Sequence, residues 1–239
     1  MYKRILITGG SRGIGAECVR CFSNGTNKVA FIYKSNDSAA LSLQKETGAY
    51  ALKADLSDSL EAHRAFELAL SYLDGIDVLV NNAGISLVSC FDDVDDSIWK
   101  NIVDTNLSSV FFVSRAVSRE MIRQKSGKII NIGSVWGRIG ASCEVHYSAT
   151  KAAIRGMTKA LAKELGPSGI TVNCVEPGVI ETDMLNSYSE ETLATLAEET
   201  PIGRLGKPSD VANLVYFLAS DLADFITGQC IGVDGGFGV

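Results

Sequence analysis

The chain has 239 residues, with 22 basic and 28 acidic side chains and a formal net charge of −6. It contains no Lys/Arg-rich run, so we do not expect nucleic acid as a partner. No apolar stretch approaches the roughly 18 residues that span a bilayer, and the first predicted strand begins at Lys3 or Arg4. We therefore expect no membrane partner and no leader segment, and we expect a cytoplasmic protein.

Apolar runs typical of buried strands alternate along the chain with segments of helical pattern. The predicted strands are RILIT, KVAFIY, AYALKAD, IDVLVNN, KIINIGS, ITVNCVEPG and CIGVDGG, which begin at residues 4, 28, 49, 76, 128, 170 and 230. The predicted helices between them include residues 16–24, 39–48 and 57–72. This alternation predicts an α/β fold in which residues 1–239 form a single-domain, doubly wound parallel sheet of Rossmann type with helices on both faces.

A glycine-rich turn, TGGSRGIG, joins the first predicted strand to the first predicted helix. Its spacing, Gly9-x-x-x-Gly13-x-Gly15, differs from the commoner G-x-G-x-x-G fingerprint but meets the same demands. These are a tight turn, close backbone approach to a pyrophosphate, and an anion site at a helix N-terminus. The alternative is an ordinary strand-to-helix loop; the strand before the turn and the helix after it favour nucleotide binding.

The end of the second strand indicates which nicotinamide cofactor is used. NAD-binding units usually carry an acidic residue there, whereas this chain has Tyr33, Lys34 and Ser35, with no carboxylate before Asp37. Arg12 lies within the glycine turn, so two cations converge where a 2′-phosphate would lie. We therefore predict NADP(H), although either cation alone is also typical of a solvated surface charge.

Tyr147 and Lys151 are four residues apart in a predicted helix, which places both side chains on one face. An ammonium group beside a phenol favours the phenolate, so Tyr147 can act as a general acid or base. A bare Tyr-x-x-x-Lys pair is common on helices without any catalytic role. Ser134, at the end of a predicted strand, and Asn106, in the helical run 104–122, combine with the glycine turn to indicate a reductase site.

These motifs, with NNAG from Asn81 and PGVIETDM from Pro177, resemble the short-chain dehydrogenase/reductases over essentially the whole chain. Within that superfamily the chain looks most like the 3-oxoacyl-[acyl-carrier-protein] reductases, which convert a 3-oxoacyl thioester to a 3-hydroxyacyl thioester. The resemblance implies that Tyr147 transfers a proton and that Ser134 hydrogen-bonds the substrate carbonyl. It also implies that Lys151 lowers the Tyr147 pKa and binds the nicotinamide ribose, and that Asn106 holds a water linking Lys151 to solvent.

The same resemblance implies the remaining contacts with cofactor and substrate. Besides Tyr147 and Lys151, the residues expected at the cofactor are Gly9, Ser11, Arg12, Gly13, Ile14, Gly15, Lys34, Asp55, Leu56, Asn82, Ala83, Gly84, Pro177, Gly178, Ile180 and Thr182. Those expected at the substrate are Ser134, Trp136, Glu144 and Met184. Residues 182–207 are polar and helix-prone and are expected to form a substrate lid, the alternative being a surface excursion without a gating role. A homotetramer is implied, formed through the helices that carry Asn106 and Tyr147.

The molecule that carries the substrate stays open at this stage. Carrier-protein reductases hold their acidic partner with basic residues, and Arg123, Lys125 and Lys128 are present, but Ser168 stands where the family has an arginine. The stretch SVWGRIGASCEVHYSATKAA more closely resembles the elongation factor P 5-aminopentanone reductases, which reduce a ketone on a modified lysine. A third alternative, a catalytically idle NADP(H)-binding scaffold, is disfavoured by the intact catalytic set.

Glu144, three residues before Tyr147, bears on the choice of substrate. It is expected either to pair with a substrate ammonium group, to be a solvated loop charge, or to cap the Tyr147 helix. The six cysteines are scattered through the chain, which favours free thiols. Cys18 and Cys21 form a C-x-x-C on a predicted helix without a second pair, so we expect helix packing there and no metal site.

Overall fold

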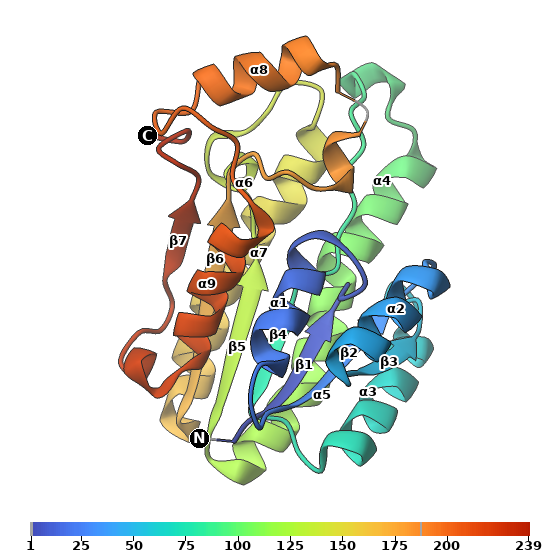
Figure 1. Ribbon diagram of the computed structural model, residues 1–239, viewed down its shortest axis with the longest axis vertical. Helices are drawn as coiled ribbons and strands as arrows, with labels where there is room; N and C mark the ends of the chain where they lie inside the picture. The colour runs from blue at the N-terminus through green and yellow to red at the C-terminus, as the bar shows by residue number, and fades with distance from the viewer. Residues whose placement is uncertain (1, 187) are drawn as a thin grey trace.

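Seven parallel strands form one sheet, in the order β3-β2-β1-β4-β5-β6-β7 (Figure 1). The computed structural model describes residues 2–186 and 188–239. All seven predicted strands are confirmed: β1 (Arg4–Thr8), β2 (Lys28–Tyr33), β3 (Tyr50–Lys53), β4 (Val78–Asn81), β5 (Gly127–Ile132), β6 (Ile170–Pro177) and β7 (Cys230–Val233). From β1 the chain builds outward through β2 and β3, then returns to place β4 on the other side of β1. The predicted doubly wound topology is therefore correct.

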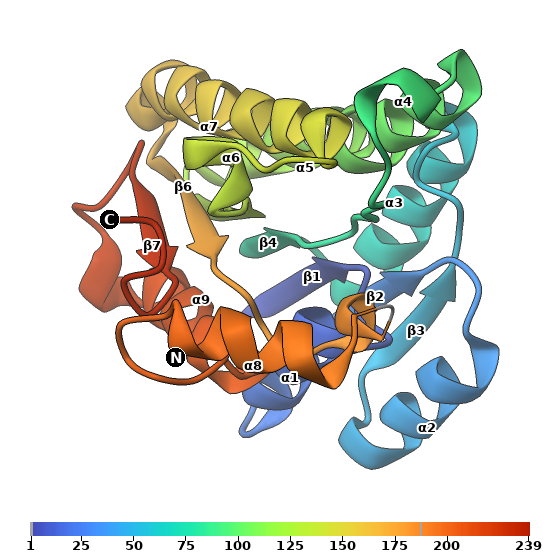
Figure 2. The ribbon, with the colours of Figure 1, turned by 90° about the horizontal axis from the view of Figure 1, so that it is seen from above.

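Helices cover both faces of the sheet, as Figure 2 shows from above. One layer holds α1 (Gly13–Ser23), α2 (Asp37–Thr47) and α9 (Pro208–Ala219), and the other holds α3 (Ser59–Leu73), α5 (Ser109–Gln124) and α7 (Val145–Leu165). Successive residues of β1 face opposite layers: Ile5 and Ile7 pack with α1 and α9, while Leu6 packs with α3 and α5. All three are fully buried, which is why the strands are continuous apolar runs in the sequence.

The run predicted as one helix over 104–122 is interrupted near its start. α4 (Asp96–Val103) leads into a π-helical segment, Asp104–Ser108, before α5 begins. Asn106 lies in this π segment with its side chain fully buried. Single π turns occur frequently at functional sites, but the apolar periodicity of the sequence does not reveal them.

The predicted lid, residues 182–207, leaves the carboxyl end of β6 and contains η4 (Asp183–Leu185) and α8 (Glu190–Glu198). The end of the segment lies beside the residues that precede it, because Gly206 forms a parallel bridge with Ile180. No α8 side chain is fully buried, and in Figure 1 the helix lies beyond the arrowheads of β6 and β7. Ser187 falls outside the described residues, and gating by this segment remains a prediction. Across residues 2–186 and 188–239, no helix is both long enough and apolar enough to cross a membrane.

A buried polar network joins β4 and β5 to α5 and α7. Asn81 Nδ2 donates to Ser114 Oγ and to Asn131 Oδ1, both at 2.9 Å. Asn131 Nδ2 in turn donates to Thr158 Oγ1 at 2.9 Å. These side chains are nearly inaccessible to solvent, so each depends on the others for its hydrogen bonds.

We predict that Asn131→Ala lowers the free energy of unfolding by about 2 to 4 kcal/mol, because Asn81 Nδ2 loses one of its two buried acceptors and the Thr158 hydroxyl loses its buried donor. Urea denaturation followed by circular dichroism measures the change. Asn101→Ala, on the exposed side of α4, is the matched control and should change stability by less than about 0.5 kcal/mol. Equal stability of the two variants would show that the network contributes little.

Candidate active site

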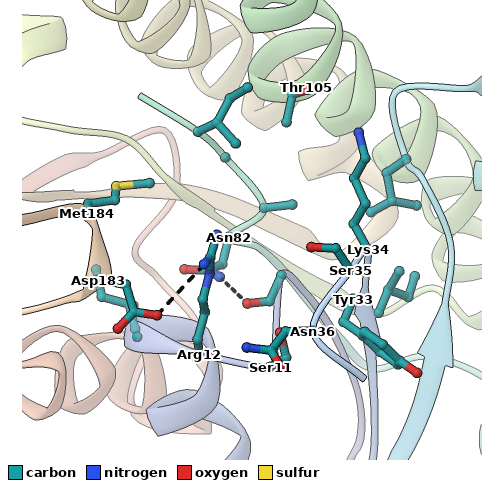
Figure 3. A pocket seen from close by; sticks show the side chains of 18 of the residues that line it. Ser11, Arg12, Tyr33, Lys34, Ser35, Asn36, Asn82, Thr105, Asp183 and Met184 are labelled. Atoms are coloured by element: carbon teal, nitrogen blue, oxygen red, sulfur yellow. Dashed lines mark hydrogen bonds and ion pairs between the residues drawn. The ribbon is translucent and has the colours of Figure 1, made fainter. Parts of the chain in front are cut away.

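A cavity of about 640 Å³ opens at the carboxyl ends of β1, β2 and β4, where the order of the strands reverses (Figure 3). Parallel α/β sheets bind ligands at this kind of switch point. The walls come from the segments that follow those strands and β3, and from the start of the predicted lid. The predicted cofactor residues among them are Gly9, Ser11, Arg12, Gly13, Ile14, Lys34, Asp55, Leu56, Asn82, Ala83, Gly84 and Thr182.

The glycine turn is shaped by close backbone approach. Gly9 and Gly13 have left-handed backbones, with φ of 64° and 54°, which favour glycine. A Cβ atom on Gly9 would lie 2.8 Å from Ala83 Cα, and one on Gly15 would lie 2.2 Å from the carbonyl oxygen of Gly9. Gly15 therefore serves the packing of the turn and does not line the cavity.

The residues present fit a dinucleotide. The turn leads into α1, and the N-cap residue Arg12 makes no side-chain cap hydrogen bond. The first N–H groups of α1 are therefore available to an anion. Arg12, Lys34 and several small polar side chains surround the same space. When bound, a nicotinamide cofactor would supply hydride chemistry.

The two cations predicted to meet a 2′-phosphate both line the cavity, but each already faces a carboxylate. Lys34 Nζ lies 2.7 Å from Asp55 Oδ2, and Arg12 Nη1 lies 3.8 Å from Asp183 Oδ2, the pair joined by a dashed line in Figure 3. All four side chains are substantially exposed, so these ion pairs are weak and exchangeable. A phosphate would have to replace them, a competition that the sequence did not indicate.

Tyr147 and Lys151 share one face of α7, as predicted. The ammonium group of Lys151 lies 5.5 Å from the centroid of the Tyr147 ring and donates to the carbonyl of Ile132 at 2.8 Å. Ser134 is buried at the end of β5, where Ser134 Oγ accepts a hydrogen bond from the Trp136 amide at 3.2 Å. This cluster adjoins the cavity, because a Cβ atom on cavity residue Gly84 would lie 3.6 Å from Lys151 Nζ.

Burial dominates the proton affinities in this cluster. Burial raises the pKa of Tyr147 to about 12; a hydrogen bond with Ser134 opposes this shift, and the negative charge of Glu144 adds to it. Burial also lowers the pKa of Lys151 to about 8. Tyr147 is therefore protonated at neutral pH and able to donate. The role of Lys151 in lowering the Tyr147 pKa remains a prediction.

The side chain of Asn106 is held by the backbone of Ile85, and the water that Asn106 is expected to hold remains a prediction. Its Oδ1 accepts from the Ile85 amide and its Nδ2 donates to the Ile85 carbonyl, both at 2.8 Å. The side chain therefore acts as a clamp on the segment that follows β4. This segment includes Gly84 and Ser86 of the cavity wall, so Asn106 positions the wall beside Lys151.

Glu144 is buried, with 6% of its surface exposed. Its carboxylate accepts from the Ser86 hydroxyl at 2.6 Å and from the Tyr188 hydroxyl at 3.4 Å. It occupies the N-cap position of α7 without a side-chain cap hydrogen bond. Because the side chain is buried, the solvated-charge hypothesis is wrong. Within residues 2–186 and 188–239, no Lys, Arg or His forms an ion pair with it. A buried carboxylate held only by hydroxyl groups is costly and suits a cationic ligand.

Several predicted residues lie outside the cavity wall. Pro177 and Ile180 are buried, and Gly178 packs against Asp234, where a Cβ atom would lie 2.8 Å from its Cα. Trp136 stacks edge-on with Phe237 at 5.4 Å, while Met184 is half exposed on the cavity wall. The cavity also contains residues that the sequence did not single out, namely Asn36, Ser57, Ser86, Thr105, Asp183 and Asn186. Thr105 lies in the π segment before α5, and the others follow strands or lie in the predicted lid.

The basic residues considered for a carrier protein lie at the opposite edge of the sheet within this chain. Lys128 is near the amino end of β5, six residues before Ser134, or roughly 20 Å along an extended strand. Its ammonium group is paired with Asp224 at 2.7 Å, and Arg123 is paired with Glu120. The segment beside the site instead exposes Asp92 and Asp93.

The surroundings of the cysteines test the expectation of helix packing, and His146 lies in α7. Cys18 is buried in the core and Cys21 packs against it, which confirms helix packing. The ligand atoms of Cys174, Glu176 and Cys230 lie within 4.8 Å of one another, but both oxygens of Glu176 contact Arg155 Nη1, at 2.5 and 2.6 Å. His146 is buried and its Nε2 contacts the Leu87 carbonyl at 2.8 Å.

The cavity lies at the switch point of the sheet, is lined by a glycine turn, and adjoins a tyrosine that can donate a proton. These features are typical of a nucleotide-dependent enzyme with an α/β fold. The family model described as enoyl-(acyl carrier protein) reductase matches residues 9–238. The 3-oxoacyl-[acyl-carrier-protein] reductase of Aquifex aeolicus is 41% identical over 236 residues, covering 97% of this chain and 95% of the relative. The corresponding reductase of Escherichia coli is 39% identical over 235 residues, covering 98% and 96%.

Solved structures agree with these relatives. The 3-ketoacyl-(acyl-carrier-protein) reductase from Brucella melitensis complexed with NADH matches with a TM-score of 0.94 and 32% identity, covering 99% of this chain and 98% of that chain. A short-chain dehydrogenase/reductase of Serratia marcescens matches with a TM-score of 0.92 and 33% identity, with the same coverage. The chain therefore belongs to the short-chain dehydrogenase/reductase family of nicotinamide-dependent oxidoreductases.

We predict that Tyr147→Phe reduces turnover by about 10²- to 10⁴-fold, because the ring stays in place while the proton donor is lost. Steady-state kinetics and fluorescence titration with NADPH separate turnover from cofactor binding, which should be retained. Tyr216→Phe, on the surface of α9, is the matched control and should keep full activity. Undiminished turnover in Tyr147→Phe would show that Tyr147 is not the proton donor.

Proposed function

We propose that the protein reduces a ketone carbonyl to a secondary alcohol with NADPH, and that its substrate is a 3-oxoacyl thioester carried on acyl carrier protein. The observation that carries this proposal is the contact between the Tyr147–Lys151–Ser134 cluster and the switch-point cavity through Gly84. The curated relatives that are 39–41% identical over nearly the whole chain are named for this reaction, which supports the choice of substrate.

In this proposal each residue has one task during reduction. The Ser134 hydroxyl hydrogen-bonds the substrate carbonyl oxygen, and Tyr147 gives its proton to the same oxygen. Lys151, anchored on the Ile132 carbonyl at 2.8 Å, stabilises the phenolate that remains. The Asn106 clamp on Ile85 keeps the cavity wall in register with these groups.

The proposal extends to the setting of the enzyme. Free thiols at all six cysteines suit a reducing compartment such as the cytoplasm. Half-exposed Phe111 on α5 suits the homotetramer expected through that helix. The start of the 182–207 segment lines the cavity, which suits its closing over the substrate.

The proposal is tested by following NADPH oxidation with acetoacetyl carrier protein and with the thioester mimic acetoacetyl-coenzyme A. We expect consumption of NADPH with both, accompanied by one equivalent of the 3-hydroxy product. If the protein binds NADPH but oxidises none of it with either substrate or with any small ketone, the proposal is wrong and the scaffold hypothesis replaces it.

The cofactor preference gives a separate prediction. Wild-type protein should use NADPH at least about tenfold more efficiently than NADH, because each charge-assisted contact with the 2′-phosphate is worth about 1.5 to 3 kcal/mol. The Arg12→Ala/Lys34→Ala double variant should lose most of this preference in kcat/KM. Lys53→Ala, which removes an exposed cation paired with Asp37, is the control. Equal use of NADH by the wild type would contradict the assignment.

A second candidate, reduction of an aminoketone on a modified lysine of elongation factor P, is favoured by one observation. Glu144 is buried without a cationic partner among the described residues, and its charge acts on Tyr147. A fatty acyl chain gains nothing from this carboxylate, whereas a substrate ammonium group would pair with it. Exposed Asp92 and Asp93 beside the site disfavour an acidic carrier.

Glu144→Gln distinguishes the two substrates. If an ammonium group pairs with Glu144, the variant should lose about tenfold or more in kcat/KM on an aminoketone and little on a neutral ketone of equal length. Asp92→Asn, an exposed carboxylate nearby, is the control. An equal effect of Glu144→Gln on both ketones would show that Glu144 does not recognise the substrate, and would favour the acyl thioester as substrate.

A further inference from the structure

Two thiols meet beside the substrate side of the site. Cys90 lies in the segment that follows β4, and Cys143 immediately precedes Glu144 and the start of α7. Their sulfur atoms are 3.9 Å apart although the residues are 53 positions apart in the chain. The Ser89 amide also donates to the Cys143 carbonyl at 2.9 Å. This backbone hydrogen bond holds the two segments together beside the thiols.

The pair is accessible to solvent, unlike two of the other four cysteines. Cys90 is exposed and Cys143 is partly exposed, whereas Cys18 and Cys174 are fully buried. The hydrogen bond with Cys143 and the nearby charge of Asp93 raise the pKa of Cys90. Cys90 is therefore protonated near neutral pH, and the pair is a dithiol until an oxidant reaches it.

Little movement separates this contact from a covalent bond. A disulfide has sulfur atoms about 2.05 Å apart, so the two sulfurs would have to approach by roughly 2 Å from their present 3.9 Å. Other contacts already hold the same two segments together. Ser86 Oγ donates to Glu144 at 2.6 Å, and His146 Nε2 contacts the Leu87 carbonyl at 2.8 Å.

We propose that Cys90 and Cys143 form a thiol modification site that is oxidised to an intramolecular disulfide by low-molecular-weight disulfides such as glutathione disulfide. One thiolate attacks the glutathione disulfide, forming a mixed disulfide and releasing one glutathione thiolate. The second cysteine attacks the mixed disulfide and releases the other glutathione. The two protons lost from the cysteines are taken up by the two glutathione thiolates, so two cysteine thiols are oxidised and one disulfide is reduced to two thiols.

The crosslink would act on the substrate side of the site. It ties the segment bearing Ser86 and exposed Leu87 and Val88 to the segment bearing Glu144, and both segments must adjust when a bulky ketone enters. The adenosine side of the cavity, at Lys34 and Asp55, lies on other strands. Oxidation should therefore raise KM for the ketone and leave the affinity for NADPH unchanged.

The test treats the full-length protein with glutathione disulfide, digests it without reduction, and identifies crosslinked peptides by mass spectrometry. We expect a Cys90–Cys143 peptide in the wild type, a rise in Tm of about 5 °C, and an increase of about threefold or more in ketone KM. Dithiothreitol should reverse all three. Cys90→Ser and Cys143→Ser should each show no crosslink and a single glutathione adduct, and Cys21→Ser should behave as the wild type.

The crosslink and the Tm shift do not depend on turnover, so they decide on the disulfide even if the proposed ketone reduction fails. Only the KM measurement rests on the proposed function. Stable glutathione adducts on both cysteines without a crosslink would overturn the proposal, as would a crosslink that leaves ketone KM unchanged in an active enzyme.

Discussion

The junction between the ends of β1 and β4 is the constraint on which the rest of the site depends. Thr8 Oγ1 accepts from the amides of Asn82 and Ala83, both at 3.0 Å. The Asn82 side chain donates back to the carbonyls of Thr8 and Gly9, at 3.0 and 2.9 Å. These four bonds hold the first glycine of the turn against the segment after β4. A side chain larger than hydrogen at Gly9 would collide with that segment, and the cavity opens where the two segments part.

The catalytic cluster shows how burial determines the chemistry. Burial lowers the pKa of Lys151, whose ammonium group donates to the Ile132 carbonyl, and burial raises the pKa of Tyr147. Burial thus moves the two pKa values apart, to about 12 for Tyr147 and about 8 for Lys151, so Lys151 is the more acidic group and can return a proton to the Tyr147 phenolate. Glu144 adds a negative charge close to the same phenol, and a cation beside Glu144 would offset the resistance of Tyr147 to ionisation.

The sequence was sufficient for the sheet, because strands buried on both faces must be apolar runs and the helices between them must cross the sheet. It also placed Tyr147 and Lys151 together, because helical periodicity fixes their relation. It did not predict the π segment at Asn106, since backbone hydrogen bonding there leaves no trace in apolar spacing. Nor did it predict that Lys34 would face Asp55 or that Ser86 would reach Glu144, because these pairs come from different strand-end loops whose meeting depends on the folded chain.

In the proposed reaction, hydride passes from a nicotinamide cofactor in the cavity to a ketone placed beside Tyr147. NADPH carrying deuterium at its transferable position, incubated with acetoacetyl-coenzyme A, tests this claim by mass spectrometry and NMR of the product. The account predicts a 3-hydroxy product with one deuterium on the former carbonyl carbon. A 3-hydroxy product without that deuterium, or recovery of unreacted ketone beside fully bound NADPH, would contradict it.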